Sequence, residues 1–468
     1  MKLYTFKIGG VYPDENKLTA ECPVKRAALP QRAVFPLNQH IGALARPVVR
    51  KGDKVKVGTL LAEAGGFVSA PVYSSVSGTV IDIAKAIDAT GYLQPAVMVQ
   101  TEGDEWEPGI DRSDRLEKLE DHPELTPEII MGRIQKAGVT GMGGASFPTM
   151  VKLNPPAGTK AECIILNGVE CEPYITSDYR LMMEYPDELL VGLDLLMKAA
   201  MVQKGYIGIE ENKPEAIRLL EEKTAGDPRI KVVPLTRKYP QGGEKQLVDA
   251  VLHRQIPAPP ALPVHVGAIV QNVGTAMAVY QAVMKNKPLI ERLTTVTGKG
   301  IAHPCNFQVR LGTSFRQLIE ACGGLPEGDN KVLAGGPMMG KSVVSLDVPI
   351  CKGTNAITVL SGEDAHRKDP QPCIRCGKCV SVCPMGLEPY LLATLSALKH
   401  YDRLEGEEIT SCISCGSCQY TCPSHRPLLD YISQGKKVVM GYIKARTARP
   451  SKKVEAAPGT TGSSSVIS

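Results

Sequence analysis

Residues 373–384 read CIRCGKCVSVCP, and residues 412–423 read CISCGSCQYTCP. Both stretches have the spacing C-x2-C-x2-C-x3-C-P, in which one loop supplies three closely spaced thiolates and the fourth cysteine ligates the other cluster of a two-cluster protein. Structural zinc also takes four cysteines, but zinc ribbons draw them from two well-separated CxxC pairs. The two stretches therefore predict two [4Fe–4S] clusters.

The same spacing assigns a cysteine set to each cluster. The first set is Cys373, Cys376, Cys379 and Cys422, and the second set is Cys412, Cys415, Cys418 and Cys383. Between the runs, residues 387–405 have apolar side chains at helical spacing, which places the loops between helices rather than in a β-hairpin ferredoxin. The other six cysteines share no ligand spacing, and we expect them to be small buried hydrophobes.

Composition narrows the class of protein. The chain has 468 residues, which suggests about three to four domains, and its net charge of +5 with 5% aromatic residues gives no basis for nucleic-acid binding. The N-terminus, MKLYTFKIGG, has no apolar core of signal-peptide length, so we expect a cytosolic protein whose fourteen cysteines serve metal or redox centres. The segment 255–284 lacks charged residues, but prolines and mid-run polar residues predict a buried strand, loop and helix rather than a membrane span.

The predicted secondary structure changes several times along the chain. Residues 1–105 are β-like and resemble the barrel-sandwich domains that carry biotin or lipoate, although their hairpin AGGFVSAP (64–71) has no lysine. After an acidic connector, residues 129–285 alternate helices and short apolar strands, which indicates a mostly parallel α/β sheet. Residues 290–350 form a small α+β unit, residues 365–430 hold the cysteine runs, and residues 444–468 are predicted to be a disordered tail.

Three polar stretches fall at predicted strand or helix ends in the α/β part. They are KAGVTGMGGASFPTMVK (136–152), NGVECEP (167–173) and QNVGTA (271–276). Each alone is more often a tight turn or a cap than a binding loop. Together they favour a flavin or nucleotide site, because ligands of open α/β sheets bind at the carboxyl ends of the strands.

These motifs carry a family resemblance. GMGGASFPTMVK (141–152), NGVECEPY (167–174), YPQGGEKQL (239–247) and NVGTA (272–276) occur in the same order as motifs of the FMN- and NADH-binding subunit of respiratory complex I. Residues 1–435 as a whole resemble the RnfC family, the C subunits of the Rnf ion-translocating ferredoxin:NAD oxidoreductase complexes. The resemblance implies a multidomain α/β and α+β fold: a barrel-sandwich domain, a complex-I-like flavin domain, a soluble-ligand-binding β-grasp and a helical two-[4Fe–4S] ferredoxin domain.

The resemblance also implies which residues bind the cofactors. Phe147 and Glu172 would lie nearest the nicotinamide nucleotide. Two departures weaken the transfer of flavin contacts, because Met142 replaces an arginine and Val169 replaces an aspartate of the complex I pattern. The residues placed beside FMN are Gly141, Gly143, Gly144, Lys152, Asn167, Glu170, Tyr239, Gly242, Asn272 and Thr275.

The function implied is electron transfer. Hydride would pass between NAD(H) and FMN, and single electrons would pass through the two clusters to or from a ferredoxin-like subunit, with no separate catalytic residue. The chain would be a peripheral subunit on the cytoplasmic face of the bacterial inner membrane, held by other Rnf subunits. One alternative is a soluble reductase similar to the cobalamin reductase of propanediol utilisation, and another is a binding scaffold with structural metal only.

Overall fold

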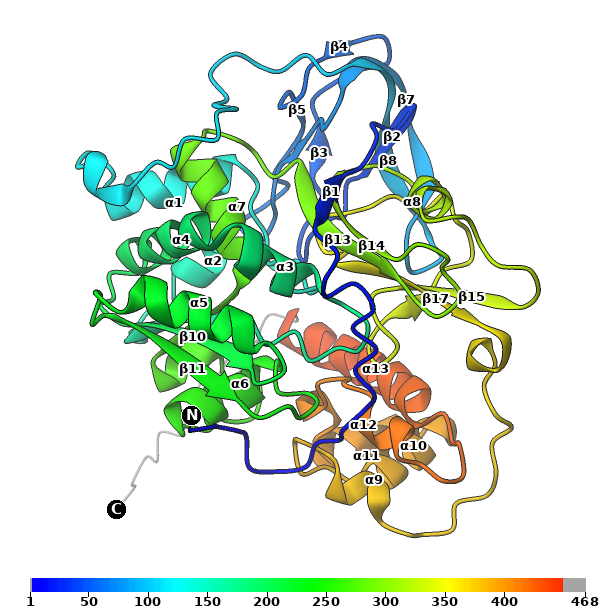
Figure 1. Cartoon of the computed structure of the whole chain (residues 1–468). Helices are drawn as coiled ribbons and strands as arrows, with labels where there is room; N and C mark the ends of the chain where they lie inside the picture. The colour runs from blue at the N-terminus through cyan, green and yellow to red at the C-terminus, as the bar shows by residue number, and fades with distance from the viewer. Residues whose placement is uncertain (1, 449–468) are drawn as a thin grey trace, which may run out of the picture.

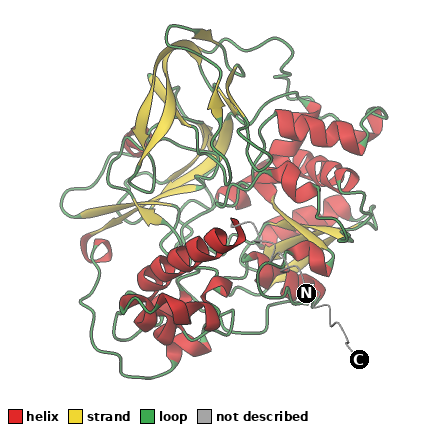
Figure 2. Cartoon of the chain, turned by 180° about the vertical axis from the view of Figure 1, so that it is seen from behind, coloured by secondary structure: helices red, strands yellow, loops and turns green. Residues whose placement is uncertain are grey.

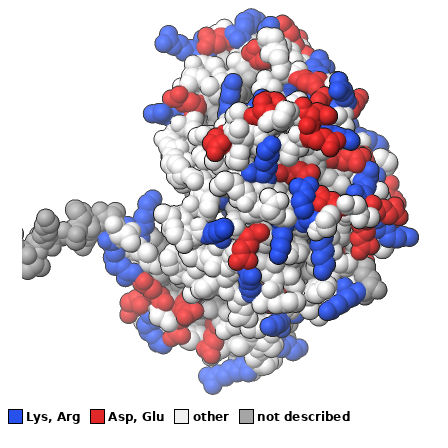
Figure 3. Space-filling view, turned by 90° about the vertical axis from the view of Figure 1, so that its left-hand side faces the viewer, with Lys and Arg blue, Asp and Glu red and all other residues white. Residues whose placement is uncertain are grey.

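The computed structural model describes residues 2–448, in which four β-sheets and a helical C-terminal part pack around one another (Figure 1). Lys and Arg side chains are interspersed with Asp and Glu over the face shown in Figure 3. Among the described residues, no helix combines the length and apolar character that a membrane crossing requires. The uncharged segment 255–284 contains the predicted strand, β12 (Ala268–Asn272), and the predicted helix, α7 (Val273–Met284), but the helix follows the strand directly, without the predicted loop between them.

Two antiparallel sheets form the barrel-sandwich part at the top of Figure 1. Their inner side chains, including Phe35 and Leu61, share one hydrophobic core with Phe315 of the neighbouring six-stranded unit. The first sheet has the order β2 (Arg32–Pro36), β8 (Leu93–Gly103), β7 (Ser77–Ile87) and β4 (Lys54–Val55). The second has the order β3 (Arg46–Pro47), β5 (Leu60–Glu63) and β6 (Val72–Tyr73).

The α/β part has a fully parallel four-stranded sheet. Its strands are covered on both faces, since Ile164 and Leu166 of β9 enter one core while Cys163 and Ile165 enter the other. Burial on both faces explains why these strands are continuously apolar in sequence. The strand order is β11 (Ile230–Leu235), β10 (Gly205–Glu210), β9 (Cys163–Asn167) and β12. The helices are α1 (Pro127–Lys136), α2 (Thr149–Leu153), α3 (Ser177–Glu184), α4 (Pro186–Ala199), α5 (Pro214–Thr224), α6 (Glu244–Leu252) and α7.

A six-stranded mixed sheet joins the barrel-sandwich and α/β parts. The helix α8 (Phe315–Ala321) packs on it through Phe315, Leu318 and Ile319. In chain order, the last strand of this sheet ends at Ser361. The strand order is β1 (Val24–Arg26), β14 (Cys305–Arg310), β13 (Glu291–Thr297), β17 (Ala356–Ser361), β15 (Asn330–Ala334) and β16 (Lys341–Ser342).

Residues 2–26 lie outside the two barrel-sandwich sheets, unlike the rest of the predicted 1–105 domain. Tyr4 forms a bridge with Leu235 of the α/β part, and the Gly10 N–H donates to the Val382 carbonyl at 2.9 Å. The segment then pairs as β1 with β14. The chain start therefore crosses the α/β, helical and six-stranded parts before it enters the barrel-sandwich (Figure 1).

Short helices around one long helix make up the C-terminal part (Figure 2). The long helix extends to Ala448, so the beginning of the predicted 444–468 tail is helical, and an ion pair of 2.5 Å joins Arg446 to Glu405. Residues 449–468 of that predicted tail lie outside the described residues. The helices are α9 (Lys378–Ser381), α10 (Pro389–Ala397), α11 (Tyr401–Gly406), α12 (Ser417–Tyr420) and α13 (Leu428–Ala448).

Candidate functional site

The two cysteine runs follow the same backbone path. Left-handed backbone angles occur at positions 375, 377 and 386 of the first run and recur at 414, 416 and 425 of the second. Gly377 and Gly416, with φ of 74° and 81°, precede α9 and α12, and glycine adopts this conformation at little steric cost. The sequence repeat is therefore a structural repeat, and its loops lie between helices as predicted.

Four cysteines from both runs surround one small cavity. They are Cys383 of the first run and Cys412, Cys415 and Cys418 of the second. Burial raises the pKa of the Cys415 and Cys418 thiols, so positively charged iron is the kind of partner that would keep them as thiolates. Among residues 2–448, no three His, Cys, Asp or Glu side chains converge closely enough for a single metal ion. The cavity and its four sulfur donors fit a [4Fe–4S] cluster.

The other cysteine set lies at the surface. Cys379 and Cys422 are neighbours whose charges interact, and both are half-buried. Cys373 and Cys376 are exposed, and the apolar side chain of Ile374 between them is 67% exposed. This set therefore belongs to a loop that is open to solvent or to another molecule.

The predicted flavin residues on strands β9 and β12 come together at the carboxyl edge of the parallel sheet. Asn167 and Asn272 pair in register as the last residues of their strands. The Asn167 side chain donates to the Gly242 carbonyl at 2.8 Å, and Asn272 caps α7 by accepting the Gly274 N–H at 2.9 Å. Two asparagines and Gly242 thus form one polar edge.

The glycine-rich loop lies against the same edge. The Gly141 N–H donates to the Phe147 carbonyl at 2.8 Å, which closes the loop, and the Met142 N–H donates to the Thr275 hydroxyl at 3.0 Å. A Cβ on Gly143 would stand 3.4 Å from the Asn272 Cβ, whereas Gly144, with φ of 111°, faces open space. The exposed backbone at Gly143 and Gly144 fits an approaching phosphate or flavin.

At Met142 and Lys152, this loop and the helix after it do not present unpaired positive charges to a cofactor. Met142 is buried in the hydrophobic core, so the residue that replaces the arginine of complex I packs internally. Lys152 on α2 forms an ion pair of 2.5 Å with Glu244 and donates to the Val270 carbonyl at 3.0 Å. Glu244 was not among the predicted site residues, although the stretch YPQGGEKQL contains it. The charge of Lys152, which would face an anionic cofactor, is therefore partly neutralised by Glu244.

Glu170 caps a helix. Its carboxylate accepts the backbone N–H groups of Asp178 at 2.7 Å and Tyr179 at 3.1 Å, in the first turn of α3. Burial, and then the nearby Glu170 charge, raise the pKa of Asp178 to about 7, and Asp178 accepts a hydrogen bond of 2.7 Å from Asn272. Asp178 was not predicted, because nothing in the local sequence indicates that it is buried beside the strand ends.

Glu172 connects the flavin part to the six-stranded unit. Its carboxylate accepts the N–H groups of Met338 at 2.6 Å and Met339 at 3.1 Å, both in the turn that follows β15. Burial raises the pKa of Glu172, while these two hydrogen bonds oppose the shift. The carboxylate predicted to face nicotinamide is thus held by a distant turn.

Lys17, on the N-terminal segment, fixes the loop that carries these acids. Its buried ammonium donates to the carbonyls of Glu170 at 2.8 Å, Glu172 at 2.9 Å and Ile175 at 2.7 Å. Burial lowers the pKa of this lysine. Its role was not predicted, since no sequence signal connects residue 17 with residues 170–175.

Tyr239 joins the flavin part to the buried cysteine set. Its hydroxyl donates to the Cys415 carbonyl at 2.7 Å, and its ring packs with Val11 and Met338. A second contact lies close by, because the Gln246 side chain donates to the Pro384 carbonyl at 3.3 Å. The cavity formed by Cys383, Cys412, Cys415 and Cys418 therefore lies beside the carboxyl edge of the parallel sheet.

Four family models match successive parts of the chain and agree with the predicted order of parts. Together they confirm the predicted fold class. They are the RnfC barrel sandwich hybrid domain at residues 4–104, the Nuo51 FMN-binding domain at 134–281, the SLBB domain at 293–342 and the 4Fe-4S dicluster domain at 365–423.

Full-length relatives extend this match to most of the chain. The C subunit of the proton-translocating ferredoxin:NAD(+) oxidoreductase complex of Clostridium ljungdahlii is 43% identical over 85% of this chain and 86% of its own length. The chain belongs to the RnfC family. The C subunit of the Na(+)-translocating ferredoxin:NAD(+) oxidoreductase complex of Acetobacterium woodii is 41% identical over 93% of this chain and 97% of its own length.

A solved structure of an NAD+-reducing [NiFe]-hydrogenase in the H2-reduced state is also similar, with a TM-score of 0.47 and 19% identity over 68% of this chain and 61% of the hydrogenase chain.

Proposed function

We propose that this member of the RnfC family carries electrons between NAD(H) and other subunits of a membrane-bound, ion-translocating oxidoreductase complex. Membership of the family and the FMN-binding and dicluster matches support this function. The same relatives do not favour the soluble cobalamin reductase considered from the sequence, and the dicluster match overturns the scaffold with structural metal only.

FMN, when bound, supplies the conversion between hydride exchange with NAD(H) and one-electron transfer. The chain would hold this cofactor at the carboxyl edge of the parallel sheet, through the glycine-rich loop, Asn167 and Asn272. The ion pair of Lys152 and Glu244 has no net charge, and an anionic group of the cofactor would compete with Glu244 for the lysine. Phe147 and Glu172 are proposed to contact the nicotinamide nucleotide.

The two clusters would have a fixed order. The observation that carries this proposal is the 2.7 Å hydrogen bond from Tyr239 to the Cys415 carbonyl. It supports placing the cluster that Cys412, Cys415, Cys418 and Cys383 would hold beside the flavin. The cluster held by Cys373, Cys376, Cys379 and Cys422 would then exchange electrons with a partner, because Cys373 and Cys376 are exposed.

The exposed loop indicates where a partner would dock. Residues 366–378 are exposed throughout, and they include Ile374 and the cations Arg375 and Lys378. We propose that an acidic, ferredoxin-like subunit of the complex binds here, and that other Rnf subunits hold the chain at the cytoplasmic face of the membrane.

An anaerobic titration tests this function. The protein is reconstituted with iron, sulfide and FMN, NADH is added stepwise, and absorbance and EPR are recorded. We expect flavin and cluster absorbance to bleach together and reduced-cluster EPR signals to develop. If dithionite reduces the clusters while NADH leaves the flavin-loaded protein oxidised, the proposed nicotinamide site is wrong.

A further inference from the structure

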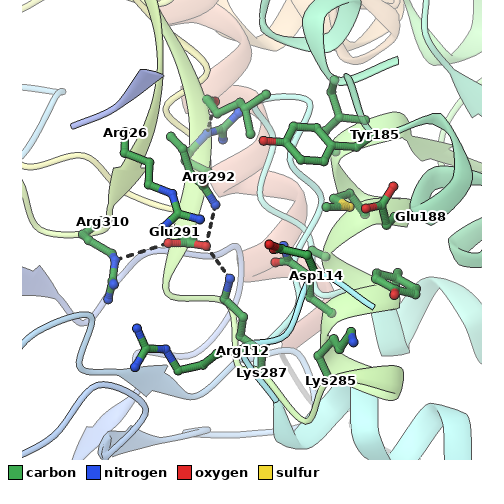
Figure 4. A pocket seen from close by; sticks show the side chains of 18 of the residues that line it. Arg26, Arg112, Asp114, Tyr185, Glu188, Lys285, Lys287, Glu291, Arg292 and Arg310 are labelled. Carbon is green, nitrogen blue, oxygen red and sulfur yellow. Dashed lines mark hydrogen bonds and ion pairs between the residues drawn. The ribbon is translucent and has the colours of Figure 1, made fainter. Parts of the chain in front are cut away.

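A second cavity borders the flavin part, because Met142 of the glycine-rich loop and Gly274 of α7 line it. It has a volume of about 420 Å³ and lies where the connector 104–115, the helices α3, α4 and α7, and the strands β1, β13 and β14 meet (Figure 4). Of the residues predicted to bind FMN or nicotinamide, none lines it. Its volume and its position between domains are typical of a site for a small ligand.

One side of the cavity carries a surplus of positive charge. Glu291 forms one ion pair with Arg310, at 3.2 Å, and another with Lys287, so the charges of both cations are partly neutralised. Arg26 and Arg112 also point to this side (Figure 4), and among residues 2–448 neither forms an ion pair of its own with a carboxylate. The Arg26 charge also helps to lower the pKa of Glu291, which three cations share, so a net positive charge remains on this side. Guanidinium groups bind phosphate oxygens in pairs, so Arg26 and Arg112 can bind an anion here.

Trp106 supports these guanidinium groups. The Arg112 guanidinium lies 4.8 Å from the centre of the indole ring and the Arg310 guanidinium lies 4.7 Å from it. The buried Nε1 of Trp106 has no hydrogen-bond partner among the described residues. The indole ring therefore holds the Arg112 and Arg310 side chains in place, and its N–H group remains available to donate a hydrogen bond.

The opposite side has a different chemistry. Asp114 and Glu188 lie there, neither with an ion-pair partner among the described residues, and the hydroxyl of Tyr185 points into the cavity between the two sides (Figure 4). Carboxylates accept hydrogen bonds from ribose hydroxyls in nucleotide sites, and an aromatic ring supplies a surface for a base. A ligand that matches both walls has phosphate at one end and a hydroxyl-bearing, flat group at the other.

We propose that this cavity binds a nucleoside 5′-diphosphate at a site separate from the flavin and nicotinamide sites. Its phosphates lie against Arg26 and Arg112, its ribose hydroxyls face Asp114 and Glu188, and its base lies beside Tyr185. The cavity also touches the flavin part, since the buried Arg292 in its wall donates to the Met142 carbonyl of the glycine-rich loop at 3.3 Å.

Equilibrium dialysis of labelled ADP against the reconstituted, FMN-loaded protein tests this site. Excess NAD+ is present throughout, so that the nicotinamide site is blocked. We expect one ADP per chain in NAD+ and at least tenfold weaker binding in the double variant Arg26→Gln, Arg112→Gln. Arg50→Gln, which changes an exposed arginine of the barrel-sandwich part, is the matched control and should bind ADP as the wild type does.

Two further measurements separate a nucleotide from a simple anion. Trp106 is the single tryptophan of the chain, so its emission should change with ADP in the wild type and in the control. Asp114→Asn should weaken ADP binding without weakening pyrophosphate binding. Displacement of ADP by NAD+, equal ADP binding in the double variant, or pyrophosphate binding as tight as that of ADP would each overturn the proposal.

Discussion

The two cysteine runs share their spacing and their backbone path but not their surroundings. Cys415 of the second run is buried beside Tyr239, whereas the corresponding Cys376 of the first run is exposed. Cluster potentials depend on burial and on hydrogen bonds to the ligand loops. The motif therefore determines the ligand geometry, while residues far away in sequence determine the environment of each cluster.

The largest expected difference between the runs is chemical access in the cluster-free protein. Cys376 should react with iodoacetamide on the order of 100-fold faster than Cys415, because burial both blocks access and raises the pKa of the Cys415 thiol, which lowers its thiolate fraction at neutral pH. Raising the pH should narrow this gap as the Cys415 thiol ionises. Peptide mass spectrometry over time measures both rates, and equal rates would contradict the burial of the second run.

A smaller difference is expected between two equivalent glycines. Replacing Gly377 or Gly416 by Ala strains a left-handed residue by roughly 1–2 kcal/mol in either run. Gly416→Ala should cost about 1–3 kcal/mol more, because its Cβ would approach the Met338 carbonyl oxygen to 2.7 Å, whereas Gly377 faces open space. Thermal unfolding followed by circular dichroism should give the lower Tm for Gly416→Ala. Equal Tm values would show that the second run does not pack on this turn.

The smallest expected effect concerns the contact between the flavin part and the buried run. Tyr239→Phe removes the hydrogen bond to the Cys415 carbonyl and should destabilise the protein by about 1 kcal/mol. Burial holds the pKa of Tyr239 well above its usual range, so the wild-type hydroxyl stays protonated and remains a donor. The loss of stability in Tyr239→Phe should therefore be the same between pH 6 and about pH 9.

Tyr442→Phe is the control for that variant, since Tyr442 is 52% exposed on α13. Denaturant titration at several pH values compares the two variants. A loss in Tyr442→Phe as large as that in Tyr239→Phe would mean that the contact with Cys415 contributes nothing specific.

Local patterns in the sequence were sufficient for much of the fold. The strand–helix alternation of residues 129–285 and the apolar helix spacing of 387–405 both depend on neighbouring residues, and each predicted its element type correctly. The gathering of Asn167, Asn272 and the glycine-rich loop followed from one rule, that parallel strands end at a common edge.

Contacts between distant segments could not be predicted in this way. Lys17 binds carbonyls more than 150 positions away, and Glu172 binds a turn of the six-stranded unit. The pairing of β1 with β14 likewise depends on a core that forms only when all the parts have folded. Hydrophobic periodicity carries no information on which distant segments a stretch will contact, so the sequence did not indicate that residues 2–26 reach the α/β and helical parts.

The order of the clusters is the central claim, and a matched pair of variants tests it most directly. Cys415→Ser and Cys376→Ser change equivalent positions in the two runs, and each reconstituted, FMN-loaded variant is titrated anaerobically with NADH while EPR follows the remaining cluster. We predict that NADH still reduces the remaining cluster in Cys376→Ser, whereas in Cys415→Ser only dithionite reduces it, because the cluster beside Tyr239 is missing. The opposite pattern, with NADH reducing the remaining cluster in Cys415→Ser but not in Cys376→Ser, would contradict the proposed order.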